Sequence, residues 1–277
     1  MGIKSNLLFS SYRTMKRAGY FTLRNSLTPY ASILMYHRIN NYDPECLSTC
    51  VDVFEETLAI LRDSYNVIPL PTLVDLISRR DAIKPGTVVI TFDDGYRDNI
   101  LVAAPLLRKY NLPATFFVTS QYIGTNRIFP WDTQSSVKHE LMSWDEVREL
   151  SRMGFEIGGH TANHVNLGTV ELDEADKEIS MSKGKIEDEI GRQITSFAYP
   201  FGGRDYIRKD IIPIIKKAGF KCCCSGYGGK VTKYSDPFAL SRSVVYQTSI
   251  ELFMEIDNFV TYIDGKTKIR LWEQHDG

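Results

Sequence analysis

Residues 88–95 read VVITFDDG, and the fold prediction starts from this stretch. Its apolar, β-rich first half predicts a buried strand that ends at two adjacent carboxylates, Asp93 and Asp94. Adjacent acids repel each other, and burying an unpaired carboxylate is costly. We therefore expect something at the end of this strand that offsets the two negative charges.

Similar apolar runs alternate with helical patterns along the chain. The predicted strands are 33–37, 88–93, 114–119, 155–160, 196–200, 220–225 and 238–244, and the predicted helices are 53–62, 73–79, 99–109, 144–153, 174–190, 205–218 and 250–262. Apolar strands separated by helices are typical of a parallel sheet buried on both faces. The sequence therefore predicts an α/β fold, a barrel of about seven units related to the (β/α)8 type. We assign residues 31–277 to this barrel and residues 1–30 to a basic segment with a helical pattern.

Polar residues gather at the ends of the predicted strands, where barrels of this kind place their chemistry. The stretch GGHTANH, residues 158–164, puts His164 four residues after His160, and a helical turn would aim both rings the same way. Two imidazoles and one carboxylate form a facial metal site with open positions, which suits Zn²⁺ or Fe²⁺. A divalent cation would offset one acid of the DD pair, and the other could stay ionised and act as a base.

Three motifs in this order resemble those of the polysaccharide deacetylases, carbohydrate esterase family four. They are TFDDG (91–95), HTANH (160–164) and AYPFG (198–202), and the resemblance extends over residues 33–245. It implies a distorted (β/α)7 barrel in which Asp94, His160 and His164 hold a divalent metal, most often zinc. It also implies that Asp93 is the general base, and that the backbone N–H of Phe201 contacts the oxyanion formed from an N-acetyl carbonyl. The implied products are acetate and a free amino sugar.

The chain departs from the family pattern at three places. Ala198 replaces the arginine that pairs with the base, CCCSGYGG has no Asp-x-x-Asp-Trp motif, and Arg242 replaces the histidine that serves as general acid. A guanidinium cannot release a proton near neutral pH. We predict that Arg242 reaches Asp93 in place of the missing arginine. His37, which ends the strand in MYHRI, is either the general acid or a hydrogen-bonded packing residue.

Three further residues are predicted to contact substrate. Trp131 lies in a long loop after the third predicted strand, where an indole could stack on a sugar ring. Tyr96 follows DDG and either lines the cleft or caps the next helix. Pro200 follows SFAY at the end of a predicted strand, beside Phe201.

The net charge, the lengths of the apolar runs and the cysteine pattern argue against several classes of protein. A net charge of -1 argues against a nucleic-acid binder. No apolar run approaches the roughly 18 residues of a membrane span, and we see no secretion signal. The five cysteines include the run Cys222–Cys224, which is a poor disulfide framework and indicates reduced thiols in the cytoplasm.

The N-terminus is strongly basic, with no acid before Asp43. On a helical wheel one side collects Arg13, Lys16, Arg17 and Arg24. This side could lie on an anionic membrane surface, or the helix could pack on the barrel.

Three functions fit the sequence. The first is a metal-dependent N-deacetylase that acts on an N-acetylated glycan, or on a lipid-linked sugar precursor at the cytoplasmic membrane face. The second is a metal-dependent hydrolase of another small amide or cyclic imide. The third is a carbohydrate-binding relative that has lost catalysis, which Ala198 and Arg242 favour but the complete set of metal ligands opposes.

Overall fold

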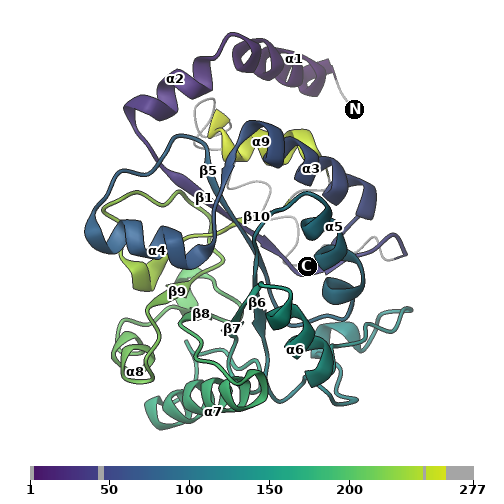
Figure 1. Ribbon diagram of the computed structural model, residues 1–277, viewed down its shortest axis with the longest axis vertical. Helices are drawn as coiled ribbons and strands as arrows, with labels where there is room; N and C mark the ends of the chain where they lie inside the picture. The colour runs from purple at the N-terminus through teal and green to yellow at the C-terminus, as the bar shows by residue number, and fades with distance from the viewer. Residues whose placement is uncertain (1–2, 43–46, 246–247, 260–277) are drawn as a thin grey trace.

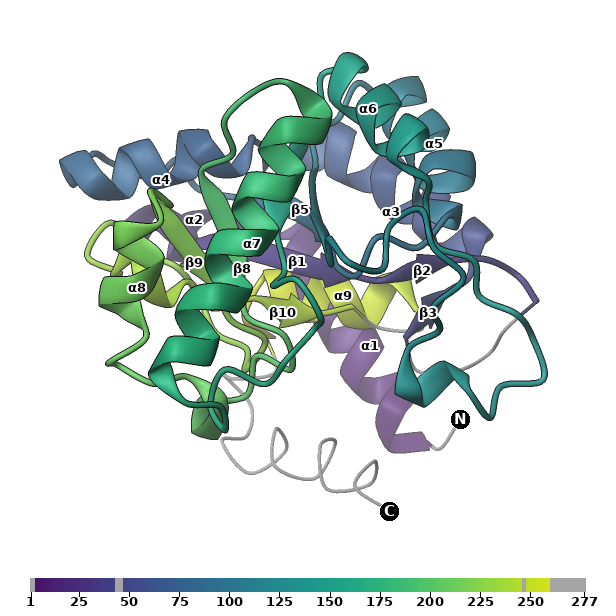
Figure 2. The same ribbon diagram turned by 90° about the horizontal axis from the view of Figure 1, so that it is seen from below.

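A computed structural model describes residues 3–42, 47–245 and 248–259 of the chain. Seven parallel strands form one curved sheet in the order β10, β1, β5, β6, β7, β8 and β9 (Figures 1 and 2). Their bounds are β1 (Ala31–Tyr36), β5 (Thr87–Phe92), β6 (Thr115–Val118), β7 (Glu156–Gly159), β8 (Ser196–Ala198), β9 (Cys222–Cys224) and β10 (Ser243–Val244). Short β4 (Asn66–Val67) also pairs with β5, whereas β2 (Arg38–Ile39) and β3 (Ser48–Thr49) pair with each other.

Residues 240–244 connect the two ends of the sheet. The Leu240 N–H donates to Cys223 O at 3.0 Å, and the Ser225 N–H donates back to Leu240 O at 2.8 Å. Three residues later, β10 pairs with β1 through Leu34 and Ser243. The same short segment therefore bonds first to β9 and then to β1, which confirms the distorted seven-stranded barrel.

Helices lie around the outside of this sheet (Figure 2), and α4 instead packs with inward-facing residues of the strands. The helices are α1 (Ile3–Arg17), α2 (Tyr20–Leu27), α3 (Val51–Ser64), α4 (Leu70–Arg79), α5 (Ala104–Lys109), α6 (Trp144–Arg152), α7 (Leu172–Ile190), α8 (Ile212–Lys217) and α9 (Ser249–Ile256). A π-helical turn (Asn99–Ala103) precedes α5, and short 3-10 turns occur at Pro130–Asp132, Arg204–Tyr206 and Pro237–Ala239.

Alternation along the strands divides the core into two layers. In β5 every residue is buried, as expected for a central strand covered on both faces. Val88, Ile90 and Phe92 pack with the surrounding helices, whereas Val89 packs with α4 and with inward residues of the other strands. Because Thr91 and Asp93 have the parity of Val89, this alternation turns both toward the barrel interior.

The N-terminal segment is helical, as predicted, and it packs on the barrel. Tyr12 and Phe21 belong to the main core, and the Tyr12 hydroxyl donates to Asp257 Oδ2 at 2.6 Å. Lys16 Nζ lies 3.1 Å from the same carboxylate oxygen and 2.6 Å from the Tyr65 hydroxyl. The basic side of the segment is therefore only partly available to solvent, because Lys16 faces the body of the protein.

Three predicted elements differ from the structure. The strand predicted at 238–244 is reduced to β10, because Asp236 and Pro237 begin a 3-10 turn in which the Phe238 N–H donates to Asp236 Oδ1. The helix predicted at 205–218 begins only at Ile212, next to Pro213, a residue that favours the first turn of a helix. The helix predicted at 250–262 ends at Ile256, and its last predicted residues lie outside the described residues.

The cysteine run forms β9, as predicted. Cys222, Cys223 and Cys224 are buried, and together with Cys50 they carry no disulfide within the described part of the chain. Cys46 lies outside the described residues.

Candidate metal and catalytic site

A cavity of about 350 Å³ opens at the carboxyl ends of the strands. Its polar lining is His37, Asp93, Asp94, His160, His164 and Arg242, and its apolar lining includes Met35, Leu47, Trp131, Phe201 and Val244. A largely apolar pocket with a few convergent polar groups is the usual form of a small-molecule site. The barrel therefore brings together the residues that the sequence had placed at separate strand ends.

Asp94, His160 and His164 lie together, as predicted for a set of metal ligands; we call these three residues the metal-ligand cluster. Asp94 Oδ1 lies 3.4 Å from His160 Nε2 and 3.2 Å from His164 Nε2. The three residues each offer a ligand atom within 4.8 Å of the others, and His160 and Asp94 are almost fully buried. This arrangement has the spacing of a facial two-histidine, one-carboxylate site.

The chemistry of these atoms fits a cation. Both carboxylate oxygens of Asp94 are buried without a hydrogen-bond partner among the described residues, which is costly for an ionised group. His160 Nδ1 lies 2.9 Å from the Ala198 carbonyl oxygen, which can only accept, so Nδ1 carries the proton. That contact leaves His160 Nε2 with a lone pair directed toward Asp94, as metal-binding histidines require.

Backbone strain is concentrated at this site. Seven non-glycine residues of the described chain have a positive φ, and four of them are Asp94 (74°), Thr161 (58°), His164 (57°) and Phe201 (63°). Such conformations cost about 1–3 kcal/mol each and persist where the surroundings impose them. Gly95 continues the turn after Asp94 with φ 87°, where a Cβ would lie 2.7 Å from the Ile123 side chain. The DDG sequence therefore forms a tight turn that directs Asp94 into the cluster.

Arg242 contacts Asp93 as predicted. Two guanidinium nitrogens, Nη1 and Nη2, each donate to a different Asp93 carboxylate oxygen at 2.6 Å, and both side chains are buried. Nη1 also donates to Thr91 Oγ1 at 3.2 Å, and Nε donates to Ser225 O at 2.8 Å. Burial raises the pKa of the Asp93 carboxyl, but Arg242 and the nearby imidazoles outweigh this effect and bring its pKa below the ordinary value. Asp93 is therefore held as a carboxylate beside the metal-ligand cluster.

His37 lines the cavity, and Asp93 and Asp94 lie close enough to affect its pKa. Burial lowers the pKa of His37, and the attraction of Asp94 and Asp93 offsets this only in part. Two hydrogen bonds fix the backbone around His37. Asn99 Nδ2 donates to His37 O at 2.7 Å, and the Ile39 N–H donates to Asp98 Oδ2 at 3.1 Å. The contact with Asp98 anchors the residues that follow β1, and no motif of the sequence indicated it.

Tyr96 does not line the cavity, so the first of the two roles predicted for it, contact with substrate in the cleft, is not supported. It is 1% exposed, and its hydroxyl accepts from Trp131 Nε1 at 2.9 Å and donates to Asp132 Oδ2 at 2.8 Å. Asp132 Oδ1 is paired with Arg38 Nη1 at 2.7 Å, and both side chains are 1% exposed. This buried chain of contacts fixes the Trp131 indole, whose ring centroid lies 4.9 Å from that of His164.

Arg38 and Asp132 therefore support the candidate site from behind Trp131, a role that the sequence analysis did not predict. The available signal was their position, since Arg38 follows His37 and Asp132 follows Trp131. Nothing in the sequence indicates that these two residues, 94 positions apart, form a buried pair.

Pro200 and Phe201 differ in their exposure to the cavity. Pro200 is buried and is not part of the lining, so its predicted contact with substrate is not supported. Phe201 is 55% exposed and lines the cavity, with its ring 5.0 Å from that of His164. Gly202 and Gly226 allow this turn to approach β9 closely, since a Cβ on Gly202 would lie 2.5 Å from Gly226 N.

Comparisons with known proteins agree with this geometry. A family model described as polysaccharide deacetylase matches residues 80–223, which is more than half of the chain. YxkH of Bacillus subtilis (strain 168) is 28% identical over 212 residues, which cover 76% of this chain and 69% of that protein. The poly-beta-1,6-N-acetyl-D-glucosamine N-deacetylase of Staphylococcus aureus (strain MRSA252) is 27% identical over 174 residues, which cover 60% of this chain and 56% of that enzyme.

Two solved structures share the fold. The Streptococcus pyogenes deacetylase PplD, in complex with acetate, has a TM-score of 0.71 at 22% identity, with 82% of this chain and 98% of that chain covered. IcaB from Ammonifex degensii has a TM-score of 0.72 at 20% identity, with 82% and 97% covered. From its motifs, its barrel and the family model that it matches, this chain is a member of the polysaccharide deacetylase family.

Proposed function

We propose that the protein hydrolyses the N-acetyl group of an N-acetylated sugar in a polysaccharide or glycan precursor and releases acetate. The observation that carries this proposal is the buried Asp93–Arg242 pair next to the Asp94–His160–His164 cluster, which sets a carboxylate base beside a cation site. The substrate class is supported by the Staphylococcus aureus relative, whose name gives poly-beta-1,6-N-acetyl-D-glucosamine as its substrate.

Asp94, His160 and His164 would hold the divalent cation, which we take to be zinc because imidazole and carboxylate ligands suit it. When bound, such a cation acts as a Lewis acid toward the acetamide carbonyl and toward water. No described helix is both long and apolar enough to cross a membrane. We infer a reducing, cytoplasmic compartment, which the unpaired thiols of Cys50 and β9 support.

The remaining residues of the cavity would divide the proton transfers. Asp93, kept ionised by Arg242, takes a proton from the attacking water as the new C–O bond forms. The Phe201 N–H, which has no backbone partner among the described residues, donates to the carbonyl oxygen as negative charge develops on it. His37 then protonates the amine nitrogen as the C–N bond breaks, and the products are acetate and a free amino sugar. Trp131 would stack on the sugar ring.

Acetate release from defined substrates tests the function. The zinc-loaded chain should release acetate from oligomers of N-acetylglucosamine, and an Asp93→Asn variant measured beside it should not. Nucleotide-linked and lipid-linked N-acetyl sugars, assayed in parallel, separate a polymer substrate from a precursor. A chain that binds zinc but releases acetate from none of them is a carbohydrate-binding relative, and turnover of a cyclic imide alone would assign it to the amidases.

His37→Gln tests the general acid. We expect kcat to fall by about 10²–10⁴, the usual contribution of a positioned acid, with metal content and melting temperature unchanged. Since His37 must be protonated to donate, the parent kcat should decline as the pH rises through the pKa of His37, and the variant should lack this limb. p-Nitrophenyl acetate has a leaving group that needs no proton. With this substrate, the kcat of the variant should lie closer to the kcat of the parent. A kcat within a few-fold of the parent on N-acetyl sugars would place the acid elsewhere.

A further inference from the structure

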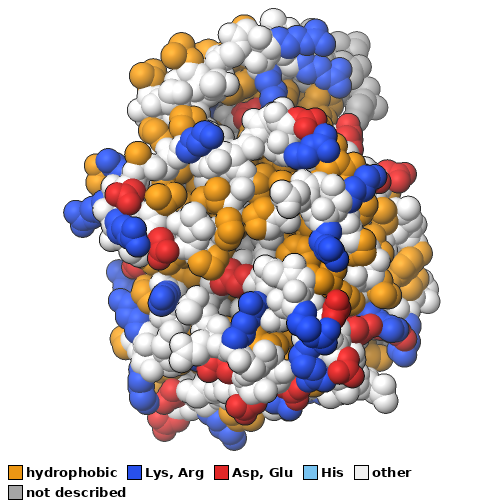
Figure 3. Space-filling view, viewed as in Figure 1, with side chains coloured by type: hydrophobic (Ala, Val, Ile, Leu, Met, Phe, Trp, Pro, Cys, Tyr) orange, Lys and Arg blue, Asp and Glu red, His pale blue; other side chains and the backbone are white. Residues whose placement is uncertain are grey.

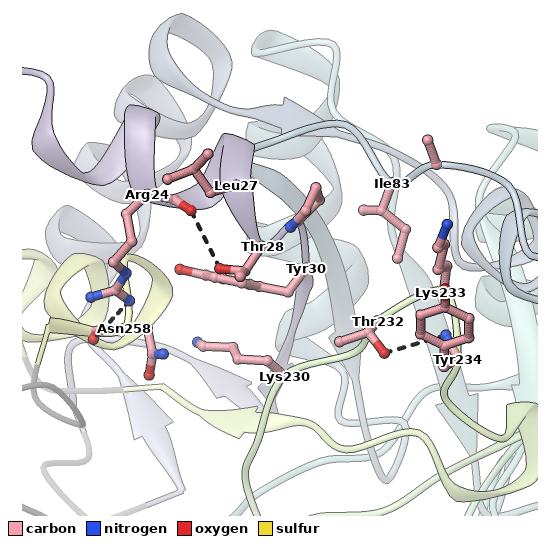
Figure 4. Close-up of a pocket in the computed structure, with 12 residues that line it drawn as sticks. Arg24, Leu27, Thr28, Tyr30, Ile83, Lys230, Thr232, Lys233, Tyr234 and Asn258 are labelled. Carbon is pink, nitrogen blue, oxygen red and sulfur yellow. Dashed lines mark hydrogen bonds between the residues drawn. The ribbon is translucent and has the colours of Figure 1, made fainter.

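A second and larger groove, of about 770 Å³, lies at the opposite end of the barrel (Figure 4). One wall is formed by Arg24 and Leu27 of α2, and the other by the loop that carries Lys230, Lys233 and Tyr234. Tyr30, directly before β1, lies between them. The six residues of β1 span roughly 20 Å, and the metal-ligand cluster lies past the far end of that strand. This groove is therefore separate from the catalytic cavity.

The lining of the groove is cationic and apolar. It contains Arg24, Lys230 and Lys233 but no aspartate or glutamate among the described residues. Arg24 donates to the carbonyl oxygens of Asp257 and Asn258, and Lys230 donates to Ser32 Oγ and Glu255 O and lies 3.6 Å from the Glu255 carboxylate. These contacts hold the two cations in place at the wall. Lys233 lies over the Tyr234 ring at 5.2 Å, on the opposite side of the groove from Arg24 (Figure 4).

Exposed apolar side chains surround the same groove. The three most exposed large hydrophobic residues of the described chain are Leu27 (76%), Tyr234 (72%) and Leu23 (66%). Leu27 and Tyr234 line the groove, and Leu23 lies one helical turn before Leu27 on α2. Exposed apolar residues gathered around one charged groove favour an interaction surface.

Further positive charge lies next to this face. Arg13 and Arg17 of α1 are exposed, whereas Lys16 between them is bound to the Asp257 carboxylate. Figure 3 shows Lys and Arg side chains gathered over α1, with hydrophobic side chains beside them over α2.

We propose that this face binds an anionic membrane surface, with a lipid phosphate in the groove and Leu23, Leu27 and Tyr234 in the interfacial layer. Exposed leucines next to cations are the usual composition of a surface that lies on anionic lipid. A second copy of the chain fits less well, because a symmetric contact would bring the cations of two grooves together. Tyr30 and Tyr234 could contact a glycan, but the exposed Leu23 and Leu27 beside the cations favour an interfacial lipid layer.

The orientation of the barrel on the membrane would affect which substrates reach the catalytic cavity. With the strand-start end of the barrel on the bilayer, the catalytic cavity faces away from it. Under the proposed deacetylase function, a polymer in solution would then be a better substrate than a sugar attached to a lipid of the same membrane. The membrane contact itself does not depend on that function, because vesicle binding and acetate release are measured separately.

Vesicle co-sedimentation of the full chain tests the proposal. We expect binding to phosphatidylcholine vesicles that contain about 30% phosphatidylglycerol, little binding to phosphatidylcholine alone, and weaker binding as salt rises. Lys233→Ala should reduce the partition coefficient roughly fivefold, as expected for one cation near the surface. The double variant Leu23→Ser, Leu27→Ser should reduce it by about tenfold or more, through lost apolar burial.

Matched controls lie at other surfaces of the molecule. Leu101 is 59% exposed and Lys138 is 69% exposed, and neither lines the groove, so Leu101→Ser and Lys138→Ala should bind vesicles like the parent. Acetate release from a soluble oligomer should be the same in all four variants. Three results would overturn the proposal: equal binding to neutral vesicles, equal losses in groove and control variants, or concentration-dependent self-association that the Leu23 and Leu27 changes abolish in the absence of lipid.

Discussion

Arg242→Met should destabilise the protein by about 3–5 kcal/mol and abolish most of its activity, because it leaves Asp93 as an unpaired buried charge. Both partners are at most 3% exposed, and each Asp93 oxygen accepts one short hydrogen bond from the guanidinium. Removal of one partner of such a pair costs far more than the pair itself contributes. Urea denaturation of the apo protein measures the free energy of unfolding, and acetate release measures the activity.

A double-mutant cycle separates the two effects. Arg242→Met combined with Asp93→Asn removes both charges, so much of the lost stability should return while the activity stays absent. Arg242→Lys keeps the charge but cannot make two parallel bonds, and it should fall between the parent and Arg242→Met. If Arg242→Met were as stable as the parent and as active, the pair would have no role in holding the base.

Asp94→Asn should remove the bound metal and lower acetate release by at least about 10³. Both Asp94 oxygens are buried without a hydrogen-bond partner in the described structure, so a cation is the group that can satisfy them. The metal content per chain, measured by elemental analysis, should fall to background. A cation at 100 times its dissociation constant should stabilise the parent by about 2.7 kcal/mol, and it should not stabilise the variant.

Two histidines provide a matched comparison for the metal site. His164→Gln removes a ligand, whereas His139→Gln changes a buried histidine that lies outside the cluster. Only His164→Gln should lose metal and the stabilisation by zinc. A cluster that kept a full complement of zinc after Asp94→Asn, with acetate release within tenfold of the parent, would contradict the assignment of these three residues.

The motifs of the candidate site could be recognised in the sequence because each is local. TFDDG contains the strand, the turn and both acids, and HTANH contains both imidazoles at a fixed spacing. Strand ends in a parallel barrel converge on one rim, so a correct fold places these short motifs together. Local hydrophobic patterns also predicted the seven barrel strands. The last of them, predicted at 238–244, is shorter in the structure, because a 3-10 turn begins at Pro237 and leaves only β10.

The side-chain orientations of Tyr96 and Pro200 could not be predicted from the sequence. Their positions beside the motifs suggested contact with substrate, but the structure turns Tyr96 into the support of Trp131 and buries Pro200. Which way a loop side chain points depends on the partners that surround it. The partners of Tyr96 include Asp132, which Arg38 fixes from another part of the chain.

The seven-stranded barrel and the candidate metal triad could therefore be predicted from the sequence, because strand periodicity and short motifs are each encoded within a few neighbouring residues. That Arg242 supplies the guanidinium lost at Ala198 was predicted from the sequence, but the tertiary structure alone set its geometry, two parallel hydrogen bonds to Asp93 across 149 positions. It also decided that α2 and the 230–234 loop form a cationic groove. Both depend on how residues 240–244 and the N-terminal helices close against the sheet, and that closure is set by packing between distant segments rather than by any local pattern.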